Sequence, residues 1–320
     1  MTDWWLLGDI GGTNARLAVS EGAGRVGHER AYGTQRLASL DAALADYLAS
    51  LPQDLSVSRC RGARIAAAGP VEGNAVKLTN AQWHIRGEDV SARIGGAPAI
   101  IVNDLEAVAA LLPHLAAGDV RMIGDAPLST GSSHAVAINL GTGLGAAAVV
   151  KTRCGQWLPI GGEPGHFSFA VSDAEDAGLL AHATTFEDYL SGRGVGHLYD
   201  VVAALAQGGD GAAPASHGLS AEGVFAAAAS DPIAQRCVRQ VSRMLGRFAG
   251  DLVLATAAWD GAFLCGSVVG GWAAVCDTAD FRVAFEAKGA MSSRMRGVPS
   301  AMILTPDPAL IGLTHLGADA

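Results

Sequence analysis

The sequence has little lysine, and its cysteines are few and scattered. Only three of the 320 residues are lysines, and the formal net charge is −9. A chain of this charge lacks the basic face that sequence-independent nucleic-acid binding needs, so no nucleic-acid partner is expected. An anionic substrate would instead be held by backbone amides, arginine and a metal ion. The five cysteines form no Cys-x-x-Cys pair, so neither a disulfide framework nor a zinc site is expected.

Long apolar runs are also missing. No uninterrupted apolar stretch reaches the length of a membrane-spanning helix, and Asp9 interrupts the first apolar run, which argues against a signal peptide. We therefore expect a cytoplasmic protein with no membrane partner. Hydrophobic residues make up 50% of the chain and charged residues 17%, which is typical of a well-buried globular enzyme. A chain of 320 residues exceeds one ordinary core, so two domains are expected.

A glycine-rich turn near the start of the chain carries the first chemical signal. The apolar run 4–7, the segment Gly8–Thr13 and the alternating run 17–19 predict a strand, a tight turn and a second strand. Glycines permit positive φ angles and close approach of the backbone to a ligand, and successive N–H groups in such a turn can hold an anion. Asp9 suits this site only if a cation accompanies the anion, which indicates a nucleotide polyphosphate with Mg²⁺. The alternative is a structural hairpin in which Asp9 caps its own turn. The motif matches neither the P-loop nor the dinucleotide-binding fingerprint.

The same plan of strand, glycine turn and strand recurs in the middle of the chain. Apolar runs at 134–140 and 146–150 flank a glycine turn at 141–145. This duplication suggests two α/β units, each contributing a glycine turn to one cleft. The remaining periodicity predicts buried strands at 64–70, 99–102 and 261–265, helices at 37–51, 105–112, 233–256 and 308–313, and a surface loop at 207–220.

Eight motifs, taken in order, resemble those of the bacterial ATP-dependent glucokinases, within the actin-like, hexokinase and Hsp70 superfamily. They are GDIGGTNARLAV (8–19), LTNAQW (78–83), VNDLEAVA (102–109), LGTGLGAA (140–147), GGEPGH (161–166), EDYLSG (187–192), FLCGSV (263–268) and FRVAFEAKG (281–289). The resemblance covers nearly the whole chain. It implies an α/β fold of two actin-like (ribonuclease H-like) lobes around a central cleft. The small lobe would span 1–110, with a C-terminal helix at about 301–320 packing back on it, and the large lobe 111–300.

The resemblance gives Asp104 the role of general base. A sugar kinase needs a positioned carboxylate that accepts the hydroxyl proton as the alcohol attacks the γ-phosphorus. Asp104 follows a predicted buried strand at its carboxyl end, where open α/β sheets bind ligands. The alternative is that Asn103 and Asp104 only cap the helix that follows.

Several polar residues would bind the sugar. A hexose presents hydroxyl groups that carboxylates and amides pair with directionally. The alternatives are that His166 is a core histidine and Glu187 a charge at a helix N-terminus. By resemblance, the residues that face glucose are Asn103, Asp104, Glu163, His166 and Glu187, with Thr79 and Asn80 as further candidates.

The nucleotide would be held from both lobes. Asp9 would hold Mg²⁺ through water, the two glycine turns would meet the phosphates, and Gly266 would lie under adenosine. Cleft closure would expel water and align the reactants. The residues implied in nucleotide binding are Gly8, Asp9, Ile10, Gly11, Gly12, Thr13, Gly141, Thr142, Gly143 and Gly266.

The sequence therefore predicts a glucokinase that converts ATP and D-glucose into ADP and glucose 6-phosphate, and the resemblance suggests a homodimer.

Two positions depart from the family pattern: Ser267 replaces a glycine near adenosine, and Pro164 replaces a glycine in the sugar loop, where it fixes φ and removes an N–H. The alternatives are a kinase for another hexose or an amino sugar, a sugar-binding regulator without catalysis, and an actin-like or chaperone ATPase. The zinc-binding cysteine cluster of the repressor/ORF/kinase sugar kinases is absent.

Overall fold

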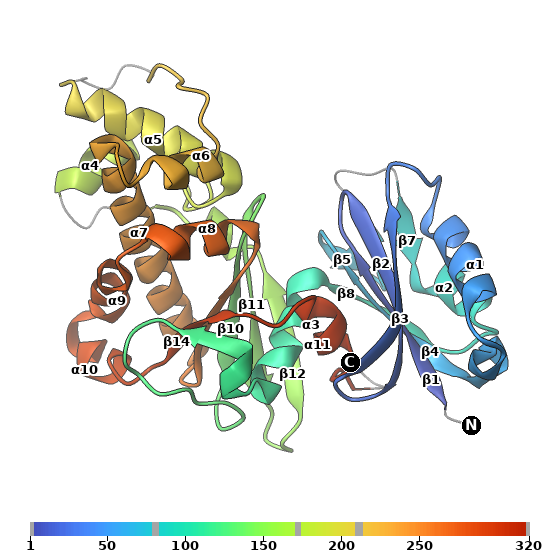
Figure 1. Cartoon of the computed structure of the whole chain (residues 1–320). Helices are drawn as coiled ribbons and strands as arrows, with labels where there is room; N and C mark the ends of the chain where they lie inside the picture. The colour runs from blue at the N-terminus through green and yellow to red at the C-terminus, as the bar shows by residue number, and fades with distance from the viewer. Residues whose placement is uncertain (1–2, 79–82, 170–173, 209–213, 318–320) are drawn as a thin grey trace. The chain divides into compact units, whose positions relative to one another are not determined.

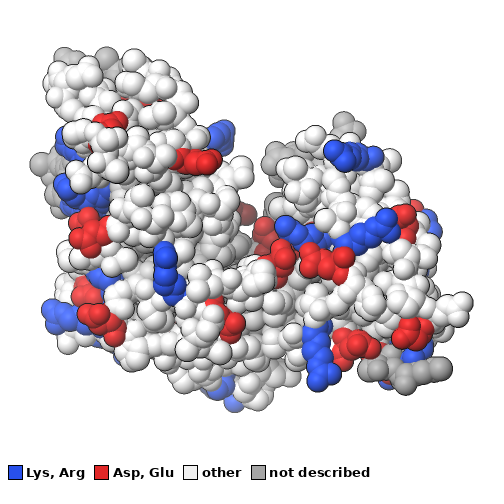
Figure 2. Space-filling view, in the orientation of Figure 1, with Lys and Arg blue, Asp and Glu red and all other residues white. Residues whose placement is uncertain are grey.

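The chain divides into two compact units. The computed structural model describes residues 3–78, 83–169, 174–208 and 214–317 (Figure 1). The first unit comprises residues 1–114, 149–161 and 305–320, and the second comprises 115–148 and 162–304. Among the described residues, no helix combines the length and apolar character needed to cross a bilayer. On the face shown in Figure 2, basic and acidic side chains are interspersed, and neither sign forms a broad patch among the residues drawn in colour.

A five-stranded mixed sheet forms the centre of the first unit. Its strands are β1 (Trp4–Ile10), β2 (Asn14–Gly22), β3 (Arg25–Gly33), β4 (Cys60–Ala67) and β8 (Ala99–Asn103). The order is β3-β2-β1-β4-β8. β1, β2 and β3 form an antiparallel meander, in which β1 and β2 are the two strands predicted around the first glycine turn. The pairs β1–β4 and β4–β8 are parallel. A separate small sheet contains β5 (Val71–Glu72), β6 (Ala75–Lys77) and β7 (His84–Arg86).

Four α-helices belong to the first unit. They are α1 (Leu40–Ser50), α2 (Gly87–Arg93), α3 (Asp104–Leu111) and α11 (Pro308–Leu313), and 3₁₀ turns lie at Gln53–Leu55, Val57–Arg59 and Leu112–His114. α1 begins three residues later than its periodicity predicts, because the Ser39 hydroxyl caps it by accepting from the Ala42 N–H at 3.3 Å. α3 ends near the predicted stop at Pro113, which lies in the following 3₁₀ turn.

The C-terminal helix α11 is fastened inside the first unit. It packs beside α3 and also contacts β1 and β4 (Figure 1). The buried Arg64 guanidinium on β4 donates to the carbonyl oxygens of Leu313 at 2.9 Å and Thr314 at 3.2 Å. A cation at a helix C-terminus satisfies the last carbonyls and complements the helix dipole. This arginine therefore anchors a segment far away in the sequence.

The second unit holds most of a larger sheet and most of the helices. The strand order is β12-β11-β10-β13-β14-β9, with β10–β13 and β13–β14 parallel and β14–β9 antiparallel. The strands are β9 (Val120–Met122), β10 (Ala135–Leu140), β11 (Leu144–Lys151), β12 (Trp157–Gly162), β13 (Gly261–Cys265) and β14 (Ser300–Ile303). The hairpin residues 149–161 of β11 and β12 are grouped with the first unit. The predicted strands at 134–140, 146–150 and 261–265 are therefore confirmed.

One long helix forms much of the core of the second unit. The sequence of α7 (Pro232–Thr256) carries an apolar stripe at helical spacing, positions 233, 237, 241, 245, 248 and 252. All of these side chains are buried except Ile233, which is half-buried at the start of the helix. The helix packs against α5 (Gly192–Ala206), α6 (Ala221–Ala227) and α9 (Thr278–Glu286). The remaining helices are α4 (Ala174–Leu180), α8 (Ser267–Val275) and α10 (Ser292–Met295), with 3₁₀ turns at Ala117–Asp119, Pro164–His166 and Gly289–Met291.

Candidate active site

The opening glycine turn joins β1 to β2 and is pinned from the end of β3. The Gly11 N–H donates to the Asn14 carbonyl at 2.9 Å, which closes the turn. The buried Thr34 hydroxyl donates to the Gly12 carbonyl at 2.7 Å, and its backbone N–H donates to the Thr13 carbonyl at 3.0 Å. Thr34 thus donates to two carbonyl oxygens of the turn, although it lies outside the sequence motif at residues 8–19.

The glycines of this turn do not act through positive φ, so that part of the sequence interpretation is wrong. None of Gly8, Gly11 and Gly12 has a positive φ angle. Gly8 lies inside β1, where a Cβ would stand 2.7 Å from Cδ1 of Ile65. At position 8, glycine therefore relieves close packing against the side chain of Ile65 and does not serve a left-handed backbone.

The carboxylate of Asp9 is paired with the guanidinium of Arg16, on the neighbouring strand. Its side chain is 20% exposed and accepts a hydrogen bond from Arg16 on β2 at 3.5 Å. Arg16 also lies 3.4 Å from Asp307 and 3.8 Å from Glu29. Burial raises the pKa of Asp9 above its ordinary value, and the Arg16 guanidinium opposes that shift. Within the described residues, Asp9 therefore pairs with the neighbouring strand instead of capping its own turn.

Asn103 and Asp104 occupy the junction of β8 and α3. The Asn103 side-chain oxygen accepts from the Leu105 N–H at 2.9 Å, and its amide donates to the Gly69 carbonyl at 3.1 Å. Asp104 Oδ1 accepts from the Leu105 N–H at 2.9 Å, and the residue is half-buried. Both residues therefore cap the helix, as the alternative interpretation expected. Capping also fixes their rotamers, which a substrate-binding pair requires.

In the second unit, Glu187 connects two of the predicted motifs. Its Oε2 accepts from the Leu144 N–H at 2.9 Å, directly after the second glycine turn. Its backbone N–H donates to the Gly165 carbonyl at 3.0 Å, in the predicted sugar loop. A Cβ on Gly143 would come within 2.8 Å of Glu187 Oε2, so glycine there permits the close approach. Glu187 is thus fixed through specific contacts and not simply as a charge near a helix start.

The loop that carries Glu163 and His166 is a short 3₁₀ turn. Pro164 takes the first position of the turn, where its fixed φ and missing N–H are tolerated. Gly165 packs so closely that a Cβ there would overlap the Leu144 carbonyl oxygen. The Glu163 and His166 side chains are both exposed, so His166 is not a core histidine. The structure therefore brings Glu163, His166 and Glu187 onto neighbouring backbone segments.

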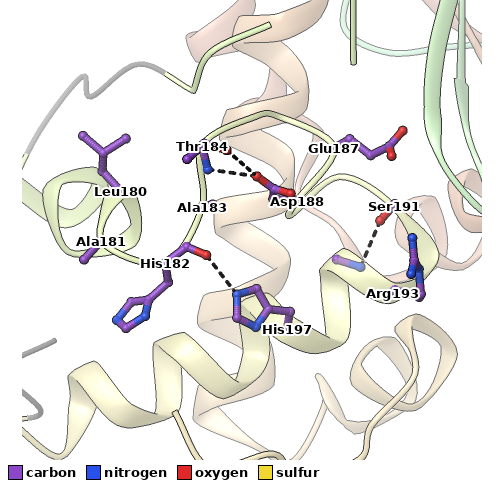
Figure 3. A pocket seen from close by; sticks show the side chains of 11 residues that line it. Leu180, Ala181, His182, Ala183, Thr184, Glu187, Asp188, Ser191, Arg193 and His197 are labelled. Carbon is purple, nitrogen blue, oxygen red and sulfur yellow. Dashed lines mark hydrogen bonds between the residues drawn. The ribbon is translucent and has the colours of Figure 1, made fainter. Parts of the chain in front are cut away.

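A cavity of about 470 Å³ lies beside Glu187. Figure 3 shows the Asp188 carboxylate turned toward Thr184, whereas the Glu187 carboxylate points the other way. Asp188 accepts from the backbone N–H groups of Thr184 at 2.9 Å and Thr185 at 2.8 Å. Burial acts to raise the pKa of Asp188, but these hydrogen bonds outweigh it and lower the pKa. Of the two adjacent acids, Asp188 closes the loop and Glu187 remains the candidate ligand.

Gly266 lies at the junction of β13 and α8, where only glycine fits. Its φ is 105°, and a Cβ would overlap the side-chain oxygen of Asn139 and the carbonyl oxygen of Leu140. The helix N-terminus that follows directs backbone N–H groups outward and favours negative charge. A cavity of about 620 Å³ adjoins it, lined mainly by small and apolar residues of α6 and α8 together with Ser267. The second glycine turn, which includes Thr142, is close, since Ser267 Oγ would lie 3.7 Å from a Cβ on Gly141.

The described residues offer few side chains that could bind a metal ion. Across the described ranges, no group of three or more histidine, cysteine, aspartate or glutamate side chains is placed to hold a metal by itself. Mg²⁺ bound with a nucleotide takes one or two carboxylates, the phosphates and several waters, so the lone carboxylate of Asp9 beside the turn fits that ion. The further sugar candidates Thr79 and Asn80 lie outside the described residues.

Comparisons with known proteins agree over nearly the whole length. A family model described as glucokinase matches residues 6–320. The chain is 34% identical over 322 residues to the glucokinase of Nitrobacter hamburgensis, covering 99% of this chain and 98% of that relative. It is 36% identical over 318 residues to the glucokinase of Aromatoleum aromaticum, covering 96% and 92%. The crystal structure of a glucokinase from an Antarctic psychrotroph matches with a TM-score of 0.86 at 28% identity, covering 98% of both chains. These matches confirm the resemblance and the α/β fold that the sequence predicts, and the chain belongs to the glucokinase family of ATP-dependent phosphotransferases.

Proposed function

We propose that this protein transfers the γ-phosphoryl group of Mg-ATP to the 6-hydroxyl of D-glucose, with Asp104 as the general base. The observation that carries the residue assignment is the junction of β8 and α3, where Asp104 is fixed at the first position of a helix. Membership of the glucokinase family supports the reaction itself.

The position of Asp104 suits late proton transfer. A helix N-terminus favours negative charge, and a carboxylate at this position is a group that can accept a proton. Phosphoryl transfer passes through a loose transition state, in which the attacking hydroxyl loses its proton late and positioning contributes most of the catalysis. The hydrogen bond from the Leu105 N–H helps to fix the orientation of the carboxylate.

The sugar is held by amide, carboxylate and imidazole groups. Asn103 uses its oxygen and one amide hydrogen within the protein, which leaves the second amide hydrogen for a sugar hydroxyl. Glu163 and His166 share one exposed turn and therefore reach a single ligand. Glu187 Oε2 is anchored on the Leu144 N–H, so the carboxylate is pre-oriented toward a hydroxyl donor.

The nucleotide is bound by the two glycine turns and the start of α8. Residues 8–13 bind the β- and γ-phosphates, residues 141–143 contact the phosphates from the second unit, and Gly266 lets the adenosine moiety approach the backbone. The cavity of about 620 Å³ beside Ser267 accommodates the adenosine portion. Asp9 holds Mg²⁺ through a bound water, and the ion neutralises charge on the phosphate oxygens when it is bound.

Coupled measurement of ADP release tests this function. Mg-ATP is supplied with and without glucose, and mannose, fructose and N-acetylmannosamine are tested at the same concentration. Glucose-dependent turnover with the highest kcat/KM for glucose supports the proposal. A higher kcat/KM for another sugar identifies a kinase for that sugar. Turnover that is indifferent to sugar indicates an actin-like ATPase, and glucose binding without turnover indicates a sugar-binding regulator.

The homodimer stays a prediction from the family resemblance, and the cytoplasmic location stays a prediction from the sequence. Sedimentation of the purified protein tests the first directly. A monomer at all accessible concentrations would contradict it.

A further inference from the structure

Glu106, at the third position of α3, uses both carboxylate oxygens within the first unit. Its Oε2 accepts from the Asn103 backbone N–H at 3.0 Å, which completes the capping box of the helix. Its Oε1 accepts from the Gly161 N–H on β12 at 3.0 Å. A capping box needs only the first of these bonds. The second bond joins the helix to a strand 55 residues away in the sequence.

The two hydrogen bonds of Glu106 form a bridge between the start of α3 and β12, and both ends of this bridge lie next to proposed sugar-site residues in the sequence. Asn103 and Asp104 form the helix start that the first oxygen holds. Gly161 precedes Glu163 by two residues along the chain, so the second oxygen holds the strand that leads into the sugar loop. A Cβ on Gly161 would stand only 3.1 Å from both Cγ and Oε1 of Glu106. Glycine at this position therefore lets the strand approach the carboxylate.

The bridge requires a carboxylate in particular. Both partners of Glu106 are backbone N–H donors, and an ionised carboxylate is an acceptor at both oxygens. A glutamine of the same shape accepts at one end only and presents an NH₂ group to an N–H donor at the other. Hydrogen bonds to an ionised acceptor are also stronger than neutral ones.

We propose that Glu106 is a positioning residue for phosphoryl transfer, which sets Asp104 and Asn103 relative to the strand that enters the sugar loop. It acts through these residues and does not itself contact the reacting atoms. The inference rests on the proposed function, because it assumes that Asp104 is the base. A role in helix capping alone would change the free energy of unfolding and leave the kinetic constants for glucose unchanged.

The test compares two variants that break the bridge with one that breaks a similar cap elsewhere. Glu106→Gln removes one acceptor. Gly161→Ala keeps the carboxylate but places a Cβ 3.1 Å from Cγ and Oε1 of Glu106, so that the side chain and the strand must move apart slightly. The control is Asp119→Asn in the second unit, since Asp119 also reaches back three residues to a backbone N–H, that of Ala116, at 2.8 Å. For each variant, kcat, KM for glucose, KM for ATP and the free energy of unfolding in urea are measured.

We expect Glu106→Gln to lower kcat/KM for glucose by about 10- to 100-fold, since small misplacements of reacting groups cost rates of this order. KM for ATP should stay within about two-fold of that of the unaltered protein. Gly161→Ala should show the same pattern, and the double variant should lose less than the product of the two single losses, because both break one bridge. Asp119→Asn should leave all kinetic constants unchanged. Because Gly161→Ala retains the cap on Asn103, it still tests the bridge if Glu106→Gln fails to fold.

Unchanged kcat/KM for glucose in a folded Glu106→Gln or Gly161→Ala variant overturns the inference, as does an equal loss in Asp119→Asn. Asp104→Asn is measured alongside to separate this failure from failure of the proposed function. If Asp104→Asn is inactive while both bridge variants are normal, only the positioning role of Glu106 is wrong. If Asp104→Asn keeps a near-normal kcat, the assigned base is wrong and the inference falls with it.

Discussion

The acidic residues of the candidate site differ in their hydrogen-bond partners. Some close a loop of the protein, whereas others are available to bind a substrate. Asp188 accepts from two backbone N–H groups of its own loop, whereas Glu163 lies exposed at the start of a 3₁₀ turn whose first residue, Pro164, has no N–H to offer it. The neighbouring Glu187 has one oxygen anchored on the Leu144 N–H. Acids with few internal partners are the better candidates for binding hydroxyl groups.

Glu163→Gln should weaken the binding of glucose and leave the binding of ATP unchanged. A hydrogen bond to a charged group contributes about 1.5–3 kcal/mol, so KM for glucose should rise by roughly ten-fold or more while KM for ATP stays unchanged. Steady-state kinetics with each substrate varied in turn measures both constants. A normal KM for glucose together with a changed KM for ATP would remove Glu163 from the sugar site.

At the scale of single elements, the junction of β13 and α8 depends on one glycine. Gly266→Ala forces a Cβ into Asn139 and Leu140 at a φ of 105°. We expect the free energy of unfolding to fall by about 1–3 kcal/mol from backbone strain, and KM for ATP to rise because the start of α8 shifts. Gly270→Ala is the matched control, since it lies within the same helix with no heavy atom near its Cβ position. Equal stability of the two variants in urea would contradict this account.

The stacked histidines beside the C-terminal helix should make the free energy of unfolding depend on pH. The rings of His114 and His315 stack with centroids 3.8 Å apart. Burial, the neighbouring His114 and the Arg64 guanidinium lower the pKa of His315 to about 4 from an ordinary value of 6.5. Because the folded state favours neutral His315, its contribution to stability is complete above pH 6.5 and is lost as the pH falls toward about 4.

His315→Phe keeps an aromatic ring but removes the titration. The free energy of unfolding of this variant should fall less between pH 6.5 and about 4 than that of the unaltered protein. Urea unfolding across this range measures the difference. Parallel pH profiles for the two proteins would show that the stacked pair does not titrate in the expected way.

The sequence predicts elements whose apolar periodicity is strong and misses those that depend on distant contacts. Helix α7 and strands β1 and β2 are predicted because each carries a sustained apolar pattern. The edge strand β12 was not predicted, since Leu158 and Ile160 are exposed and Pro159 interrupts the run. α5 was also missed, because glycines dominate its first turns, although Val195, Leu198 and Val202 carry helical spacing.

The same contrast applies to the candidate site. The motifs locate the side chains that would face substrates, because those residue types follow from the chemistry. They do not include Thr34 or Asn139, and they include Glu106 without indicating its role. The contacts of these three residues join segments far apart in the sequence. The error over positive φ in the opening turn has a similar origin, since Gly8 is required by the packing of Ile65 on the next strand.

At the scale of the whole molecule, the chain passes between its two units at residues 114–115, 148–149, 161–162 and 304–305. The third passage separates Gly161, which Glu106 holds, from Glu163 of the proposed sugar loop. The proposed base lies in one unit and most of the proposed sugar ligands lie in the other.

The substitution Asp104→Asn tests this account most directly. Kinetics of ADP release and calorimetric binding of glucose are measured on the same preparation. We expect glucose affinity to remain nearly intact and kcat to fall by roughly 10²–10⁴-fold, because the amide cannot accept the hydroxyl proton. A near-normal kcat would contradict the assignment of Asp104 as the general base.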